Sequence, residues 1–161
     1  MAKKKTNSKS IFTNGIAMLT SLLVMIFYCG AHLTASALGS SASEAGFSTM
    51  SDLFKVDNDA SATIAGIMIL VMFILAALVF VLSLVNMLSA LNVIKNVKFL
   101  KAINMILSVV LVVAGLVGII CLAVYIKDIS VMSVGWAFIT NVILSAVTCL
   151  ALVLDYVMAR K

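Results

Sequence analysis

The chain has 161 residues, of which 64% are hydrophobic and only 11% charged, and its mean hydropathy is +1.26. A soluble domain is about 45–50% apolar and about 25% charged, so this composition excludes an ordinary water-soluble protein and indicates lipid surroundings. The net charge of +5 does not indicate nucleic-acid binding, because the basic residues gather at a few places along the chain. The length suits one compact unit.

Four uncharged stretches organise the chain, and each exceeds the roughly 20 residues that a helix needs to cross a bilayer. They are Ser10–Ser43, Ala60–Ile94, Ala102–Ile126 and Ile129–Leu154. Backbone groups in lipid must be hydrogen-bonded within the segment, so helices are expected. The prediction is an all-α integral membrane protein, a single four-transmembrane-helix bundle over residues 1–161. Its helices are expected at about 11–38, 62–94, 101–126 and 131–157.

The basic residues predict the orientation of this bundle. With four spans, both termini and the link between the second and third helices share one side of the membrane. That side carries nine Lys and Arg: Lys3, Lys4, Lys5, Lys9, Lys95, Lys98, Lys101, Arg160 and Lys161. The other side carries only Lys55 and Lys127. This bias predicts cytoplasmic termini in the cell membrane, with anionic lipid headgroups as partners on the basic side.

The first hydrophobic segment fits two interpretations. A basic start, an apolar run and the small residues Ala35-Ser36-Ala37 also describe a secretory signal peptide, which would be cleaved after Ala37. An uncleaved helix is favoured by a polar face that a discarded peptide would not need. Its members recur at spacings of seven, seven and four residues: Asn14, Ser21, Tyr28 and His32.

An outer loop is expected over residues 39–61. Apolar residues at spacings of three and four predict a short helix over 47–56, which either lies on the membrane surface or packs over the bundle. Asp57-Asn58-Asp59 is similar to the start of a calcium loop, but Ala62 and Met68 stand where such a loop needs Gly and Glu. Asp57, Asp59 and Ser61 are instead predicted to cap the second helix.

Small and polar residues form stripes on the remaining helices, where they let helices approach closely and form hydrogen bonds. The second helix carries Ala76, Ser83, Asn86 and Ala90, and the third carries Asn104, Ser108, Gly115 and Gly118. The fourth carries Ala137, Asn141, Ser145 and Cys149. A short turn is expected to bring Asn86 and Asn104 close together. These stripes, with the polar face of the first helix, are the candidate helix-packing or pore-lining residues.

Two ionisable residues interrupt the apolar helices, and such residues are functional candidates by default. His32 is interpreted as a hydrogen-bonded interfacial residue, and Asp155 is predicted to form an interfacial ion pair with Arg160. Neither lies at mid-membrane. One His and three scattered Cys give no metal-ligand spacing, and no spacing marks a Ser-His-Asp set. No catalytic residue, cofactor or metal is therefore expected.

The layout of four spans, inner termini and a larger first outer loop resembles claudin-type proteins in topology only. Their tryptophan and paired-cysteine signature is absent from residues 39–61. The leading functional hypothesis is a non-enzymatic accessory or scaffold subunit that acts through helix–helix contacts with other membrane proteins or with itself. The alternative is a transport or pore-forming protein, including a holin-like assembly. A small lipid-modifying enzyme is a third hypothesis that lacks clustered acidic or histidine residues.

Overall fold

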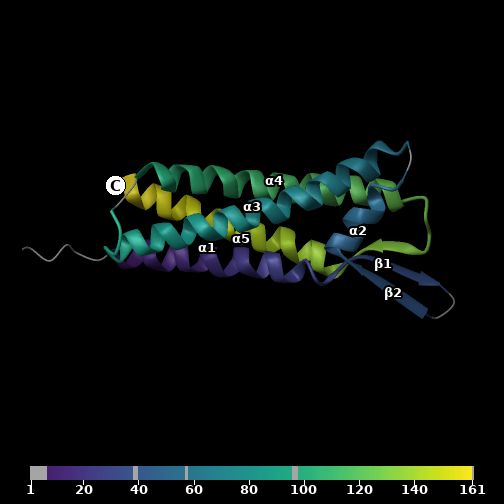
Figure 1. Cartoon of the computed structure of the whole chain (residues 1–161), viewed down its shortest axis with the longest axis horizontal. Helices are drawn as coiled ribbons and strands as arrows, with labels where there is room; N and C mark the ends of the chain where they lie inside the picture. Colours follow the sequence, from purple (N-terminus) through teal and green to yellow (C-terminus); the bar gives the residue numbers. More distant parts are fainter. Residues whose placement is uncertain (1–6, 38–39, 57, 96–97, 161) are drawn as a thin grey trace, which may run out of the picture.

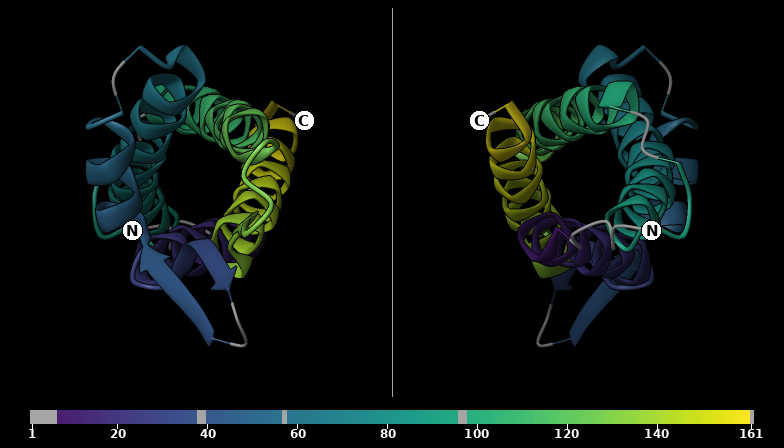
Figure 2. Two further views of the ribbon diagram at one scale, coloured as in Figure 1. Left: turned by 90° about the vertical axis from the view of Figure 1, so that its right-hand side faces the viewer. Right: turned by 90° about the vertical axis from the view of Figure 1, so that its left-hand side faces the viewer.

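Four long helices form a closed bundle in the computed structural model, which describes residues 7–37, 40–56, 58–95 and 98–160 (Figure 1). They are α1 (Ser8–Phe27), α3 (Ala60–Ala90), α4 (Lys98–Ile126) and α5 (Trp136–Arg160). Each packs against two neighbours, in the circular order α1, α3, α4 and α5 (Figure 2). All four are long and apolar enough to cross a membrane. The predicted four-helix architecture is thus present within the described residues.

The bundle has two distinct ends. The start of α1, the end of α5 and the α3–α4 link lie together at one end, here called the termini end (Figure 1). A small sheet and the short helix α2 (Gly46–Leu53) lie at the other, here called the sheet end. Lys9, Lys95 and Lys101 are at the termini end, and Lys55 and Lys127 are at the sheet end. The two groups of basic residues that the sequence places on opposite sides of the membrane therefore lie at opposite ends of the bundle.

The all-α prediction missed a three-stranded antiparallel sheet. Its strands β1 (Ala31–Ala37), β2 (Ser40–Ala45) and β3 (Met132–Val134) lie in the order β2-β1-β3. The first helix therefore ends at Phe27, where a prediction from hydropathy alone extended it to about residue 38. Strand pairing with β2 and β3 satisfies the backbone of β1 instead, and the hydroxyls of Thr34 and Ser133 meet across the β1–β3 pair at 2.6 Å.

Local capping fixes the ends of α3. Asp59 Oδ1 accepts hydrogen bonds from the backbone N–H of Ser61 at 2.8 Å and of Ala62 at 3.1 Å, as predicted for a capping residue. Asp57 lies outside the described residues. At the other end, Asn92 adopts a left-handed φ of 61° and Val93 N–H donates to Leu88 O at 3.0 Å. This Schellman-type motif ends the helix at Ala90, before the predicted residue 94.

The short helix of the outer loop begins and ends slightly earlier than the predicted range of 47–56. It buries Gly46, Thr49 and Leu53 and packs against the outer end of α3. The ring of Phe54, just beyond α2, lies over Gly66 of α3. These contacts agree with the interpretation in which the loop packs over the bundle.

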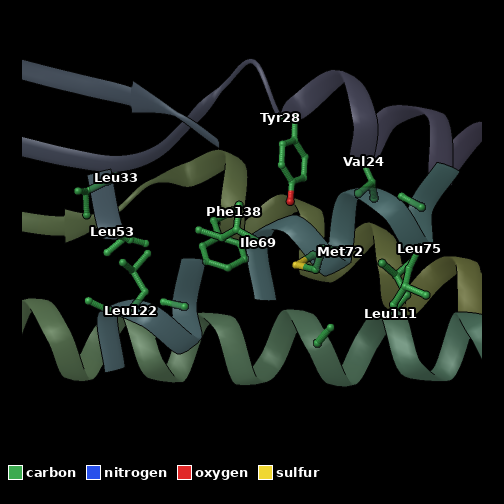
Figure 3. Packing of buried hydrophobic residues seen from close by; sticks show 14 of the residues in the cluster. Val24, Tyr28, Leu33, Leu53, Ile69, Met72, Leu75, Leu111, Leu122 and Phe138 are labelled. Carbon is green, nitrogen blue, oxygen red and sulfur yellow. The ribbon is translucent and has the colours of Figure 1, made fainter. Parts of the chain in front are cut away.

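The core lies between the long helices. Figure 3 shows Ile69, Met72 and Phe138 between the helices, with Leu122 and Leu111 further along the bundle on either side of them. A Cβ on Gly115 would lie 2.9 Å from Val142 Cγ2, and one on Gly118 would lie 2.9 Å from Phe138 Cζ. These two glycines therefore permit the close approach of α4 to α5 that the stripe on the third helix predicted.

The outward faces of the long helices are apolar. Phe12, Phe99 and Leu150 are each about two-thirds exposed, and Ile120 and Ile143 are nearly as exposed. In water such continuous apolar exposure is unfavourable, whereas in a bilayer it is the ordinary lipid-facing surface. The fold is thus that of a mostly helical protein with four helices able to span a membrane.

Candidate functional site

The polar stripes of all four long helices point into one bundle. The candidates from those stripes and from the polar face of the first segment are all at most 3% exposed. They are Asn14, Ser21, Tyr28, His32, Ser83, Asn86, Asn104, Ser108, Asn141 and Ser145. We call these, with the further buried side chains Ser10, Thr13, Ser89, Thr148 and Asp155, the buried polar set. The set runs from the sheet end to the termini end and forms three local clusters.

The first cluster joins three helices at the termini end. Lys101 Nζ, on α4, lies 2.9 Å from Asp155 Oδ2 on α5 and donates to Ser10 Oγ on α1 at 2.7 Å. Thr13 Oγ1 donates to Asp155 Oδ1 at 3.2 Å. The side chains of Lys101 and Asp155 are only 10% and 3% exposed, so the charges are removed from solvent and neutralise each other.

The partner of Asp155 among the described residues is Lys101, and the predicted pairing with Arg160 stays a prediction. Arg160 follows Asp155 on the same helix, but its side chain lies outside the described part of the protein. Lys101 belongs to α4 and lies one turn after the start of that helix. A search for partners near in sequence cannot find this pair, because only the bundle topology places the start of α4 beside the end of α5.

The second cluster links the helix pairs at intermediate levels of the bundle. Asn104 Nδ2 donates to Ser83 Oγ at 3.0 Å, so an amide forms a hydrogen bond across the α3–α4 contact. The partner is Ser83, and Asn86 Nδ2 has no hydrogen-bond partner among the described residues. Thr20 and Thr148 join α1 to α5 through hydroxyls 2.6 Å apart. Neither Thr20 nor Thr148 was predicted from the sequence. Thr13 and Thr20 do recur with a seven-residue period on the inner side of α1, which is a signal for the first of them.

The third cluster lies at the sheet end around His32, which belongs to β1 rather than to a helix. His32 Nδ1 is 2.9 Å from Gly30 O, and Nε2 is 3.3 Å from Asn141 Nδ2. A carbonyl only accepts and an amide nitrogen only donates. The imidazole therefore carries its proton on Nδ1 and accepts at Nε2. Burial lowers the pKa of His32, which favours this neutral form.

Aromatic rings close this cluster. The ring of Tyr28 lies 4.9 Å from that of Phe73 and 5.2 Å from that of Phe47, and the ring of His32 stacks on Phe138 at 5.4 Å. Burial raises the pKa of Tyr28 well above its usual range. The side chain of His32 is only 1% exposed. The cluster therefore suits a structural role at the base of the sheet better than acid–base chemistry.

Several amide atoms in the bundle interior lack partners among the described residues. They are Asn14 Oδ1, Asn86 Nδ2, Asn104 Oδ1 and Asn141 Oδ1. A buried polar atom without a partner costs about 1–3 kcal/mol. A protein that only needed close helix packing would gain by replacing such amides with apolar side chains. These atoms are the part of the interior that packing alone does not explain.

The two ionisable candidates, His32 and Asp155, lie at opposite ends of the bundle. His32 lies at the sheet end and Asp155 at the termini end, so the two do not meet (Figure 1). No group of three His, Cys, Asp or Glu side chains able to hold a metal ion occurs in the described ranges. Cys29, Cys121 and Cys149 are free thiols on separate segments.

A comparison with protein-family models, with curated proteins and with solved structures finds no match to this chain. The class is therefore defined by the fold alone. It is a mostly helical protein with four helices that can cross a membrane, an internal polar set and an antiparallel sheet at one end of the bundle.

Proposed function

We propose that this chain is a non-enzymatic, multi-pass protein of the cell membrane that serves as an accessory or scaffold subunit, with both termini in the cytoplasm. Support for insertion comes from the four apolar helices and their outward apolar faces. Support for the orientation comes from the basic residues at the termini end. Labelling of single cysteines introduced at Lys95 and Lys127 tests it: an impermeant reagent added to intact cells should reach position 127 and not position 95.

The polar stripes do not supply the contact surface for a partner. Every polar member of the stripes predicted to pack helices is buried inside its own bundle, so none is left to meet another protein. The stripes therefore give no support for contacts between this bundle and another membrane protein. The proposal rests instead on the sheet end, where the β1–β2 hairpin extends beyond the bundle (Figures 1 and 2).

The observation that carries the proposal is the outer edge of β2. In the order β2-β1-β3, β2 pairs with β1 and with no other strand within the described residues. Proteins usually protect an exposed edge with charged side chains, above all lysine, with proline or with a covering segment. Ser40–Ala45 contains no lysine and no proline, and its one charged residue is Glu44. Addition of a strand from another chain is a common mode of recognition at such an edge. We therefore assign the outer edge of β2 to an extended segment of a partner subunit.

Neighbouring proline substitutions test this assignment. In an antiparallel pair, adjacent residues direct their N–H groups to opposite edges, so of Ser41→Pro and Ala42→Pro one removes an N–H from the β1 side and the other from the outer edge. The outer-edge variant should keep its thermal stability and lose the subunit that co-purifies in mild detergent. Co-expression of two differently tagged copies distinguishes a second copy from another protein. A wild-type particle that is strictly monomeric and carries no partner contradicts the proposal.

A second candidate function is favoured by the unpartnered amides. Asn14, Asn86, Asn104 and Asn141 contribute such atoms between the two ends of one bundle, and hydration of these atoms would create a path for water or a small polar solute. Reconstituted liposomes test this candidate through their flux of water and small solutes. The double variant Asn86→Leu with Asn104→Leu should abolish the flux. An unchanged flux in that variant removes the support for a path through the bundle.

A further inference from the structure

We propose that the seam between α1 and α5 at the termini end binds one anionic phospholipid. Two hollows adjoin there and share Lys9 and Met158. The first, here called the polar hollow, has a mixed lining that includes Asn7, Lys9, Ser10 and Asp155, and the second is almost wholly apolar, so together they match the two halves of a lipid molecule. This site is independent of the sheet end and of the proposed partner.

The polar hollow has a volume of about 170 Å³ and is lined by Asn7, Lys9, Ser10, Asp155, Met158 and Ala159. The carboxylate of Asp155 does not repel an anion strongly, because Lys101 neutralises it at 2.9 Å. Lys9 makes no ion pair with a described residue, so it leaves the hollow with one uncompensated positive charge. The positive end of the α1 dipole adds to this charge. The hollow therefore suits a phosphate group.

The apolar hollow has a volume of about 370 Å³ and is lined by Ser8, Lys9, Phe12, Thr13, Leu154 and Met158. The hydroxyl of Thr13 is already bonded to Lys9 O at 3.1 Å and to Asp155 Oδ1 at 3.2 Å. Phe12 and Leu154 are 69% and 56% exposed on the outward face. In a membrane that face is covered by lipid, and an acyl chain is therefore the occupant.

The junction of the two hollows selects the ligand class. In a phospholipid the phosphate and the acyl chains are joined by a short glycerol, so the two binding regions must touch, as these do at Lys9 and Met158. A free phosphate compound uses only the polar hollow. Zwitterionic phosphatidylcholine carries a bulky cation that gains nothing from Lys9. An anionic lipid with a small headgroup, such as phosphatidylglycerol, meets both requirements.

The test measures thermal stabilisation and lipid retention of the full chain in detergent. The probes are dioleoyl phosphatidylglycerol, dioleoyl phosphatidylcholine and glycerol 3-phosphate. Phosphatidylglycerol should raise the unfolding temperature and remain bound in native mass spectra at lower concentration than phosphatidylcholine. Equal effects of the two lipids overturn the proposal. Equal protection by glycerol 3-phosphate also overturns it, because the apolar hollow would then contribute nothing.

Matched variants locate the site. Lys9→Gln should weaken phosphatidylglycerol binding about fivefold, the contribution expected of one lysine near a headgroup, whereas Lys95→Gln at the same end should change it little. Leu154→Ala should weaken retention of the lipid, and Leu150→Ala, one turn away on α5 and outside the hollow, should not. All four substitutions are on exposed side chains, so folding is preserved. Identical losses in test and control variants contradict a localised site.

Discussion

Lys101 Nζ and Asp155 Oδ2 meet at 2.9 Å between α4 and α5, and the hydroxyls of Ser10 and Thr13 connect the pair to α1. Removal of one member of a buried pair leaves an uncompensated charge and typically costs about 3–5 kcal/mol. We expect Asp155→Ala to lower the free energy of unfolding by an amount in that range. Denaturant titration in detergent, followed by Trp136 fluorescence, measures it.

The double variant Lys101→Met with Asp155→Leu is the informative control for that prediction. It removes both charges and should recover most of the lost stability, because apolar replacement of a buried pair is often neutral or stabilising. The exposed pair Lys55–Asp52, 2.7 Å apart, provides a second control, since surface pairs contribute about 0–1 kcal/mol. If Asp155→Ala costs no more than Asp52→Ala, the termini-end cluster does not hold the helices together.

The glycines of α4 give a packing prediction. Gly118→Val should destabilise the bundle by about 1–3 kcal/mol, because its side chain would collide with Phe138 and Met68. Gly15→Ala is the matched control, since a Cβ there meets nothing within 4 Å. Alanine in place of an unconstrained helical glycine should stabilise by about 0.5–1 kcal/mol. The same unfolding measurement compares both variants, and opposite signs are expected.

His32 predicts a dependence of stability on pH. Burial lowers the pKa of His32 below the usual value of about 6.5. Between the lowered pKa and pH 6.5 the imidazole therefore stays neutral in the folded chain and binds a proton in the unfolded chain. The free energy of unfolding should therefore fall as the pH decreases from about 6.5 towards the lowered pKa, and it should be level above about 6.5. His32→Gln should flatten this slope, because His32 is the only histidine. A slope that persists in the variant would assign the effect to another group.

Residues 1–37 are predicted to remain in the mature protein. In the folded chain, α1 packs between α3 and α5, and Ala17 and Val24 are fully buried there. Cleavage after Ala37 would remove α1, one of the four long helices of the bundle, and would expose the polar stripes of α3 and α5 to lipid. A protein tagged at both ends should show both tags in one membrane-extracted species. Loss of the N-terminal tag alone would favour the signal-peptide interpretation.

Periodicity and hydropathy predicted much of the helical bundle. The stripe residues Ser83, Asn104 and Asn141 are inside, as amides and hydroxyls are expected to be when the surroundings are lipid. Gly115 and Gly118 lie at close helix contacts for the same reason. These features depend on the local pattern of one helix and its solvent, so a single sequence contains the information.

The sheet and the buried ion pair depend on contacts between distant segments. Ala31–Ala37 is as apolar as a helix end, and only its pairing with Ser40–Ala45 and Met132–Val134 makes it a strand. The Lys101–Asp155 pair likewise arises from the order of helices around the bundle. Hydropathy does not distinguish a helix that continues from a strand that begins just beyond the lipid, and it carries no information on which helices are neighbours.

The pairing of β1 with β3 has a mechanical consequence. β1 follows α1, β3 precedes α5, and Gly135 N–H donates to His32 O at 2.8 Å, so the hairpin is fastened to both helices at the sheet end. At the opposite end the same two helices are tied by Thr13 and Asp155. A force applied to the hairpin is thus transmitted to both α1 and α5. Displacement of the hairpin would therefore act on the contact between α1 and α5.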